Sequence, residues 1–385
     1  MVYRGREVPA SLPILNLCLP LEGFHAADRM LMRILAFESS CDETAAAVVE
    51  YKDGRFAVRS NIVASQIAVH ARFGGVVPEI ASRAHCEAVS GIAYEALAKA
   101  GLTAAEIDAV AVTNNPGLIG ALLVGVNFAK SLAFSWNKPL IAVNHIKGHI
   151  AANYLCHETL TPPFLAFVAS GGHTSMLRVN DYREYAVLGG TRDDAMGESF
   201  DKVARVMGMP YPGGAALDKL AYEGKDPISF PSAAIHDGTL DLSFSGIKTA
   251  VLNFINQETQ KGNELPRADI AAGFVNAAVS SVTAKLGMAF DRNPDLHTLV
   301  LAGGVAANSH LRTALGAFSA ARNISLYMPE LRYCGDNAAM IGAAACFEFE
   351  AENFSDESLN AYAYFELEFW SFFWMKMPFF SLTFV

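Results

Sequence analysis

Cysteine is scarce in this chain of 385 residues, and its six cysteines are scattered along the sequence. No two of them form a C-x-x-C pair, so a reduced cytoplasmic protein is a better interpretation than a disulfide-stapled secreted domain. Charged residues are also few, at 18% against 52% hydrophobic residues, which excludes a disordered chain and predicts large buried cores. The length is enough for two domains of ordinary size.

Three common sequence patterns are absent as well: G-x-G-x-x-G, G-x-x-x-x-G-K-[ST] and H-E-x-x-H. Their absence disfavours dinucleotide folds, P-loop nucleotide sites and the common zinc-protease mechanism. The net charge of −10 argues against a protein that grips nucleic acid unaided, because phosphate contacts supply most of that affinity. The charge does not exclude a local basic patch or a basic partner. No Pro-rich or Ser-rich linker divides the chain, so its halves should be joined tightly.

The two ends of the chain differ in composition from the middle. Residues 1–31 carry an apolar patch that proline and asparagine interrupt, which makes a poor secretion signal. We expect this segment to be an extension ahead of a natural start at Met30 or Met32. Residues 353–385 form an unusually aromatic tail, and charged residues and a proline break it into pieces too short for a membrane span. We assign no function to the tail, for which an aberrant reading frame is favoured over a docking strip, and we expect no membrane as a partner.

One short pattern occurs twice in the chain. Residues 35–44 read L-A-F-E-S-S-C-D-E-T, and residues 165–174 read L-A-F-V-A-S-G-G-H-T. In both copies an apolar run leads into a short polar turn and a second apolar run follows, which predicts strand, tight loop and strand. Such a loop can wrap a phosphate with its backbone N–H groups. Two copies predict two similar lobes that close on a nucleotide from opposite sides.

The spacing of apolar residues predicts further strands that alternate with helices. Strands are expected at residues 58–65, 107–112 and 140–143, and helices at residues 78–100, 118–134 and 145–154. A strand, a loop and a helix are expected again over residues 298–318. This alternation predicts an α/β fold class.

His145 and His149 are four residues apart on one predicted helix, where both imidazoles share a face and can share a metal ion. Ile146 stands where a zinc protease needs glutamate, so that mechanism is disfavoured. Asp336 is a candidate third ligand, because it follows a predicted strand at a turn of small residues. Two histidines at this spacing also occur by chance, so a pair without metal stays open.

Two loops contain candidate binding and catalytic groups. Ser170–Thr174 offers backbone amides and hydroxyls to a phosphate, and a plain hairpin turn is the alternative. Asp42, in the first copy of the pattern, could orient a nucleophile or take its proton, and an exposed polar turn is the alternative. The acidic stretch 193–201 could face a ribose or a metal, or it could be the start of a helix stabilised by its dipole.

These motifs together resemble the universal tRNA threonylcarbamoyladenosine transferase family, in its bacterial TsaD group, once labelled O-sialoglycoprotein endopeptidase. From about Met32 to Phe349, the matching motifs are E-S-S-C-D-E-T, G-G-V-V-P-E-I-A-S-R, H-x-x-x-H, S-G-G-H-T, F-D-K, P-G-G, F-S-G-I-K-T and A-G-G-V-A-A-N. The resemblance implies the actin/Hsp70/sugar-kinase fold, a duplicated RNase H-like fold with a nucleotide cleft between its lobes. Lobe I would then span residues 32–145, lobe II residues 146–336, and residues 337–352 would form a helix returning to lobe I.

The resemblance also implies an activity, transfer of the threonylcarbamoyl group from threonylcarbamoyl-AMP to tRNA. The acceptor is N6 of the adenosine just 3′ of the anticodon in tRNAs that read codons beginning with A, and AMP leaves. One iron (Fe²⁺ or Fe³⁺) or zinc ion per subunit would be bound by His145, His149 and Asp336, and Asp42 would be needed for transfer. The implied adenylate contacts are Val168, Ala169, Ser170, Gly171, Gly172, Asp201, Gly214, Asp218 and Asn308. The implied partners are tRNA, a catalytically silent paralogue and a small P-loop ATPase.

The chain departs from the family pattern at a few positions. Asn144 stands where many relatives carry a further histidine, and Met196 and Ser199 replace smaller residues. The family stretch after Phe349 is lost to the aromatic tail, which puts C-terminal packing in doubt. Three rival functions stay open: a small-molecule kinase of the same fold, a metal-dependent peptidase and a nucleotide-sensing scaffold. The histidine pair speaks against the kinase, the missing glutamate beside His145 against the peptidase, and the metal constellation against the scaffold.

Overall fold

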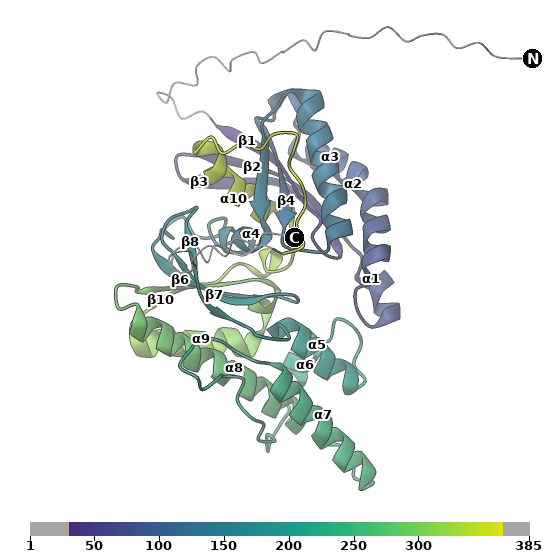
Figure 1. The fold of residues 1–385 in the computed structure, drawn as a ribbon, viewed down its shortest axis with the longest axis vertical. Helices are drawn as coiled ribbons and strands as arrows, with labels where there is room; N and C mark the ends of the chain where they lie inside the picture. Colours follow the sequence, from purple (N-terminus) through teal and green to yellow (C-terminus); the bar gives the residue numbers. More distant parts are fainter. Residues whose placement is uncertain (1–30, 365–385) are drawn as a thin grey trace, which may run out of the picture. The chain divides into compact units, whose positions relative to one another are not determined.

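The computed structural model describes residues 31–364. Nearly all of the predicted N-terminal extension and most of the predicted aromatic tail lie outside the described residues. Within the described part, the chain builds two five-stranded sheets with helices packed against them (Figure 1). The predicted α/β fold class is therefore confirmed. We call the first sheet with its helices lobe I and the second sheet with its helices lobe II.

The first sheet has the strand order β3-β2-β1-β4-β5. β1 pairs antiparallel with β2 and parallel with β4, and β4 pairs parallel with β5. Its strands are β1 (Met32–Glu38), β2 (Glu43–Lys52), β3 (Arg55–Ser65), β4 (Ala109–Asn115) and β5 (Leu140–Asn144).

The second sheet repeats this topology strand for strand, with the order β10-β9-β6-β7-β8. β6 pairs antiparallel with β7 and parallel with β9, as β1 does with β2 and β4. The register matches too, since Glu38 lies opposite Ala45 and Val168 lies opposite Ser175. The repeated sequence pattern thus marks the duplication of a whole sheet. The strands are β6 (Phe164–Ala169), β7 (Thr174–Val179), β8 (Tyr185–Gly190), β9 (Thr298–Ala302) and β10 (Ser325–Tyr327).

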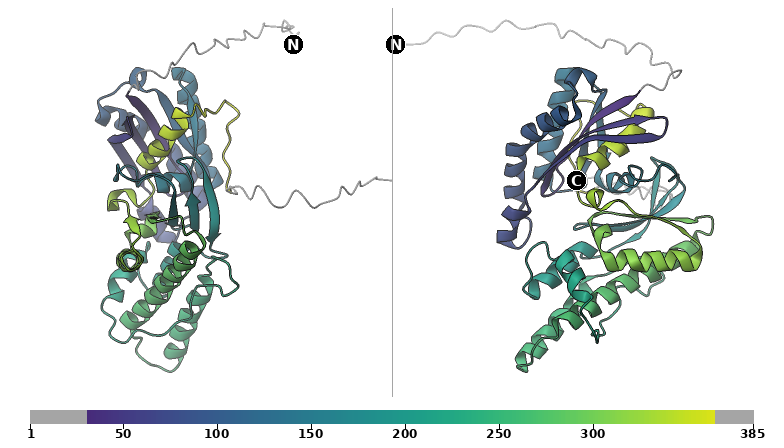
Figure 2. Two further views of the ribbon diagram at one scale, coloured as in Figure 1. Left: turned by 90° about the vertical axis from the view of Figure 1, so that its left-hand side faces the viewer. Right: turned by 180° about the vertical axis from the view of Figure 1, so that it is seen from behind.

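Two helices, α4 (His145–Ala151) and α10 (Ala338–Glu350), share one hydrophobic core with the inner faces of both sheets. Figure 2 shows the yellow-green ribbon of α10 packed against the purple strands of the first sheet. Small residues let them approach closely. A Cβ on Gly148 of α4 would lie 2.6 Å from Ile341 of α10, and a Cβ on Gly342 would lie 2.6 Å from Val49 of β2. The apolar Ala-rich sequence of α10 is thus explained by its position between the two sheets.

The outer face of each sheet is covered by the longer helices. α2 (Pro78–Ala100) and α3 (Ile119–Trp136) cover the first sheet. α2 has the predicted bounds because Pro78 suits the first helical position and Gly101, at φ 68°, ends it in the left-handed conformation. The second sheet is covered by α5 (Met196–Val206), α6 (Gly214–Ala221), α7 (Ser245–Gln260), α8 (Arg267–Arg292) and α9 (Ser309–Arg322). The shorter elements are α1 (Ile67–His70), η1 (Ala71–Phe73), η2 (Ala104–Glu106), η3 (Gly304–Ala307) and η4 (Leu331–Tyr333).

Two of the described helices, α3 and α8, are long and apolar enough to cross a membrane by length and composition alone. Both pack along a sheet in this fold. Leu122 and Val126 of α3 lie in the outer core of lobe I, and Phe274 and Val282 of α8 lie in the outer core of lobe II. This packing accounts for their apolar character.

The chain continues to pack against lobe I after α10. The amide of Ser355 donates to the carbonyl of Leu140 at 2.8 Å, and the amide of Tyr362 donates to the carbonyl of Asn114 at 2.9 Å. The sequence had put the packing of the segment after Phe349 in doubt. The structure shows that this segment packs against lobe I as far as the described residues extend, to residue 364. These contacts use backbone groups, which do not depend on the side chains that the family carries here.

Candidate active site and metal centre

The helix α4 begins where β5 ends, and Asn144 fixes its start. The side-chain oxygen of Asn144 accepts hydrogen bonds from the amides of Ile146 at 2.9 Å and Lys147 at 3.1 Å. Asparagine is a strong N-cap residue, so it supports the helix at this position without contributing a further histidine. The helix ends at Ala151 and continues as turns, which is shorter than the predicted range to residue 154.

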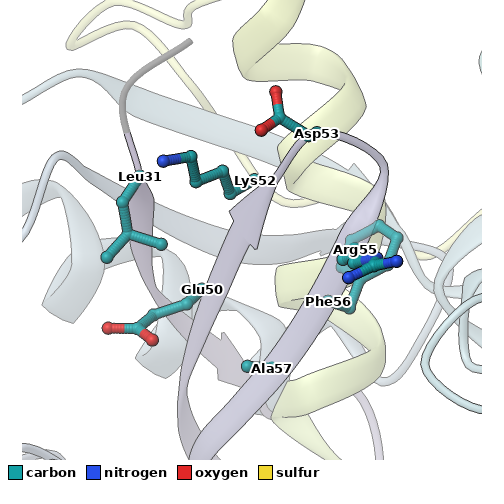
Figure 3. A pocket seen from close by; sticks show the side chains of 7 residues that line it. All are labelled: Leu31, Glu50, Lys52, Asp53, Arg55, Phe56 and Ala57. Carbon is teal, nitrogen blue, oxygen red and sulfur yellow. The ribbon is translucent and has the colours of Figure 1, made fainter.

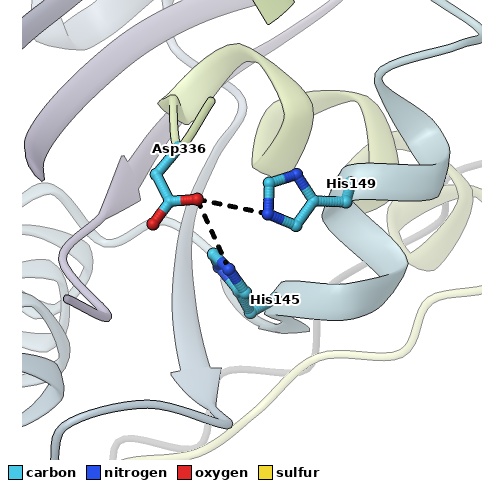
Figure 4. Close-up of side chains that lie close together, drawn as sticks. All are labelled: His145, His149 and Asp336. Carbon is cyan, nitrogen blue, oxygen red and sulfur yellow. Dashed lines mark ion pairs between the residues drawn. The ribbon is translucent and has the colours of Figure 1, made fainter. Parts of the chain in front are cut away.

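His145 and His149 lie on one face of α4 with their ring centroids 4.5 Å apart. The Oδ1 atom of Asp336, just before α10, lies 3.2 Å from Nε2 of His149 and 3.5 Å from Nε2 of His145 (Figure 4). Ligands about 2.1 Å from one ion are roughly 3.0–3.4 Å apart, so this spacing suits a shared cation. The three predicted ligands form a cluster that could bind a metal ion.

The electrostatics of this cluster also suit a cation. Nδ1 of His149 is buried without a hydrogen-bond partner among the described residues, while its Nε2 faces Asp336. Burial together with the His145 charge lowers the pKa of His149. Burial lowers the pKa of His145 too, but the charges of Asp336 and Glu38 outweigh it and raise that pKa to about 9. A buried neutral imidazole is costly when its nitrogens bind nothing. A cation would give the Nε2 lone pairs of both rings a common partner.

Glu38, at the end of β1, holds the other side of His145. Its Oε2 lies 3.0 Å from Nδ1 of His145 and accepts from the hydroxyl of Thr113 at 2.6 Å. Burial raises the pKa of Glu38, but the charge and hydrogen bond of His145 bring it below its usual range. No separate role for Glu38 was predicted, although it opens the E-S-S-C-D-E-T motif. Its position shows that this motif supports the metal-binding cluster of His145, His149 and Asp336 as well as the loop.

The first loop, between β1 and β2, places Asp42 opposite lobe II. The side chain of Asp42 is mostly buried, and its backbone carbonyl accepts from the amide of Gln66 at 2.9 Å. Burial and then the charge of Asp42 raise the pKa of Tyr211, and the same charge adds to burial in raising the pKa of Asp201. Both partners belong to lobe II. The Asp42 carboxylate therefore lies within electrostatic reach of the opposite lobe.

The second loop joins β6 to β7 and is closed by its own end residues. The amide of Ser170 donates to the carbonyl of His173 at 2.8 Å, and the amide of His173 donates to the hydroxyl of Ser170 at 3.1 Å. A Cβ on Gly171 or Gly172 would meet no described atom within 4 Å. The backbone here is therefore open to an approaching anion, as the phosphate hypothesis requires.

Two other glycines let neighbouring elements pack directly against this second loop. A Cβ on Gly197, at the start of α5, would lie 2.6 Å from the carbonyl oxygen of Ser170. Gly303 has φ 92°, and a Cβ there would overlap the carbonyl oxygen of Ala169. Glycine is required at both places by close approach, so α5 and the turn before α9 stay next to the loop.

Relatives in sequence decide the family. A family model described as tRNA N6-adenosine threonylcarbamoyltransferase matches residues 57–343. The relative of that name from Clostridium perfringens (strain 13 / Type A) is 54% identical over 330 residues, which is 85% of this chain and 96% of the relative. This chain belongs to the tRNA N6-adenosine threonylcarbamoyltransferase family. The relative from Clostridium botulinum (strain 657 / Type Ba4) is 51% identical over 336 residues, covering 86% and 96%. The predicted family and its assignment to the transferases are confirmed.

Solved structures with a similar fold are much more distant from this family member. HypF from T. kodakarensis has a TM-score of 0.56 at 14% identity and covers 85% of this chain and 48% of its own. Full-length HypF in a phosphate- and nucleotide-bound form has a TM-score of 0.55 at 16% identity, with 84% and 47% covered. At these identities the likeness shows the fold alone. It agrees with the duplicated sheets and confirms the two-lobed actin/Hsp70/sugar-kinase-like fold class.

Most of the adenylate contacts that the family resemblance implied lie around the second loop. Val168 and Ala169 are fully buried and expose no atom to a ligand in this structure. Asp201 holds the start of α6, since its Oδ1 accepts from the amide of Gly214 at 3.0 Å. Asn308 caps α9 and accepts from its third amide at 2.8 Å. Their contacts with adenylate stay predictions.

Asp218 differs from the other implied contacts because both of its oxygens are occupied within the protein. Its Oδ2 accepts from the amide and hydroxyl of Ser309 at 2.9 and 2.6 Å, and its Oδ1 lies 2.6 Å from Nδ1 of His310. These bonds fix the start of α9, and Tyr222 stacks on His310 with ring centroids 3.9 Å apart. In the described structure Asp218 thus acts as an anchor, and a contact with adenylate stays a prediction.

His173 is a site residue that was not singled out from the sequence, although it lies in the quoted S-G-G-H-T motif. Its ring centroid lies 6.3 Å from that of His145. Burial and the charges of His145 and His149 lower the pKa of His173 to about 4. It is therefore a neutral imidazole between the second loop and the metal cluster.

The acidic stretch before α5 serves mainly to join elements. Asp193 accepts from the amides of Phe244 at 2.9 Å and Ser245 at 3.1 Å, at the start of α7. Asp194 pairs with Lys202 at 2.8 Å and with Lys248 at 2.5 Å. These partners support the structural interpretation of Asp193 and Asp194 over a ribose or metal contact.

A surface pocket lies at the far end of the β2–β3 hairpin (Figure 3). None of the predicted site residues of this family member lines it. Its lining residues are Leu31, Glu50, Lys52, Asp53, Arg55, Phe56 and Ala57. The pocket gives no support to a second nucleotide or metal site.

Proposed function

We propose that this chain transfers the threonylcarbamoyl group from threonylcarbamoyl-AMP to N6 of the adenosine 3′ of the anticodon in tRNAs reading codons that begin with A. One observation carries the proposal beyond family membership. His145 of the metal cluster lies between the two loops, with Nδ1 3.2 Å from the Ser40 hydroxyl of the first loop and its ring 6.3 Å from that of His173 in the second. Groups able to hold an adenylate, a cation and an acceptor therefore meet at one place.

The donor would be held by its adenylate on lobe II. The open backbone at Gly171 and Gly172 suits the phosphate, and Asp201 and Asn308 lie on the elements packed next to that loop. His145, His149 and Asp336 would hold one iron or zinc ion, since two imidazoles and a carboxylate suit either metal. When bound, such an ion supplies Lewis-acid polarisation of an acyl oxygen.

Asp42 would act on the acceptor from lobe I. An exocyclic adenine amine is a poor nucleophile, and a carboxylate can orient it and accept its proton as the new N6–C bond forms. The bond between the carbonyl carbon and the phosphate oxygen breaks, and AMP leaves with that oxygen. Burial and the charges of Asp336 and Asp42 raise the pKa of Glu43 to about 9, so this neighbour is neutral at pH 7.

The partners and the location belong to the same proposal. A net charge of −10 makes unaided binding of tRNA weak, so a catalytically silent paralogue and a small P-loop ATPase would supply part of the tRNA-binding surface. The free state of the five described cysteines is in keeping with a reducing cytoplasm. No membrane is needed for this reaction.

Nucleoside analysis of tRNA tests the proposal. The purified full chain is incubated with the paralogue, the ATPase, ATP, preformed threonylcarbamoyl-AMP and a tRNA that reads an A-initial codon. The expected product is threonylcarbamoyladenosine at the position 3′ of the anticodon, and a tRNA that reads other codons serves as the matched control. Absence of the modified nucleoside, while the donor threonylcarbamoyl-AMP is present in the mixture, would contradict the proposed function.

A further inference from the structure

His85 is a fully buried histidine of α2 whose ring contacts Cys41 of the first loop and Thr44 of β2, on either side of Asp42. Nδ1 lies 2.7 Å from the hydroxyl of Thr44, and Nε2 lies 3.0 Å from the carbonyl oxygen of Cys41. The histidines of the metal cluster differ, because their Nε2 atoms face the carboxylate of Asp336. The contacts of His85 therefore serve the loop and leave no nitrogen for a ligand.

These contacts fix the tautomer of His85. A carbonyl oxygen can only accept, so Nε2 carries the proton and donates it to Cys41. Nδ1 then accepts from the hydroxyl of Thr44. Burial lowers the pKa of His85, so the ring stays neutral and both hydrogen bonds persist at neutral pH. In a buried setting such bonds are strong and directional.

The backbone of the first loop is held from outside at three successive carbonyls. Ser40 accepts from the amide of Leu118 at 2.8 Å, and Asp42 accepts from the amide of Gln66 at 2.9 Å. The middle one, on Cys41, is held by the side chain of His85. The other two contacts join backbone groups. The contact between His85 and Cys41 is therefore the one of the three that a side-chain substitution can remove.

We propose that His85 is a positioning residue for the transfer reaction, which clamps Cys41 and Thr44 from α2 and thereby aims the Asp42 carboxylate at the attacking amine. The proposal rests on the proposed function, in which Asp42 accepts the proton of the attacking amine. His85 contacts the loop and neither the donor nor the acceptor. A misplacement of about 1 Å costs roughly 100-fold in rate. Loss of the clamp should therefore lower kcat, while donor binding on lobe II is kept.

Substitutions at both ends of the clamp test this inference in the full chain with its partner proteins and tRNA. His85→Ala should lower kcat about 100-fold. Its KM for threonylcarbamoyl-AMP, AMP affinity by calorimetry and metal content should stay within about twofold of wild type. His157→Ala is the matched control, because His157 also contacts a backbone carbonyl, that of Met328 at 2.9 Å, away from the first loop.

A second pair of variants separates the clamp from folding. Thr44→Val removes the hydroxyl and should lower kcat, whereas Thr44→Ser keeps the hydroxyl and should restore the rate.

A double-mutant cycle decides whether His85 acts through Asp42. In an Asp42→Asn background, where the carboxylate is already lost, His85→Ala should cause no further fall in the residual rate. Equal fold losses in both backgrounds would overturn the positioning role, as would a parallel loss of AMP affinity and metal. If Thr44→Val and Thr44→Ser behave alike, the clamp is also refuted. A wild-type rate for Asp42→Asn alone would instead refute the role given to Asp42 in the proposed function, so the two failures are distinguishable.

Discussion

The carboxylate of Glu38 lies 3.0 Å from Nδ1 of His145, on a ring whose Nε2 lies 3.5 Å from Asp336. Glu38 is itself anchored, because the hydroxyl of Thr113 donates to Oε2 at 2.6 Å and the amide of Ser40 donates to Oε1 at 2.5 Å. Both oxygens thus face hydrogen-bond donors, and only an ionised carboxylate satisfies them all. A histidine held at Nδ1 in this way presents the lone pair of Nε2 to a metal.

Glu38→Gln should weaken metal binding about 10- to 100-fold, as loss of an outer contact to a ligating histidine usually does. The amide group would face either the Ser40 amide or Nδ1 of His145, and the second contact favours the wrong tautomer. Metal titration of the metal-free protein measures the change. Glu50→Gln, which alters a carboxylate paired with Arg33 on the neighbouring strand, is the control and should bind metal as wild type does. Equal affinities for both variants would show that Glu38 does not orient His145.

His149→Ala should abolish metal loading, because it removes one of three ligands and leaves two that cannot close a site. Elemental analysis of the purified variant measures the metal content, with about one ion per chain expected for wild type. The fold should survive, which AMP binding on lobe II can report. Unchanged metal content in the variant would remove His149 from the ligand set.

Metal binding should release a proton and strengthen with pH. The pKa of His145 is raised to about 9 in the metal-free protein, mainly by the charges of Asp336 and Glu38 against the effect of burial. Below that pH the proton competes with the cation, so apparent affinity should rise about tenfold per pH unit and level off above about pH 9. Calorimetry in buffers of different ionisation enthalpy counts the released proton. Affinity that is flat between pH 6 and 8 would contradict this linkage.

The framework of the site follows from local sequence signals. The paired motifs around Leu35 and Leu165 predict both hairpins, because an apolar run, a small-residue turn and a second apolar run are local features. The spacing of His145 and His149 likewise fixes their common face within one helical turn. Asp336 was placed by its turn and by the family resemblance, and the structure brings it to both histidines.

The supporting contacts could not be predicted, because they join residues that are distant in sequence. Glu38 reaches His145 across 107 residues, and His85 reaches Thr44 across 41. Such pairs depend on how α2 and α4 pack on the first sheet, and single-sequence patterns do not contain that packing. No secondary-structure element was predicted from the sequence of residues 245–292. In the structure these residues include α7 and α8, which form much of the outer core of lobe II.

Gly172→Val should weaken AMP binding substantially while the fold persists. A Cβ at Gly172 meets no described atom within 4 Å, so the side chain has space in the protein but obstructs an anion that approaches the backbone. Calorimetry with AMP measures the loss. Gly316→Val is the control, since its Cβ also meets nothing within 4 Å but lies on α9. Identical AMP affinities for the two variants would move the phosphate away from the second loop.

In the proposed function, lobe I supplies a carboxylate for a transfer whose donor is held by lobe II and by the ion bound to His145, His149 and Asp336. The most direct test is the single-turnover rate of tRNA modification by Asp42→Asn with preformed threonylcarbamoyl-AMP. The rate should fall by about 10²–10⁴-fold, the usual contribution of a well-placed base, with metal content and AMP affinity unchanged. A near wild-type rate would contradict it and leave Asp42 as a residue of the turn.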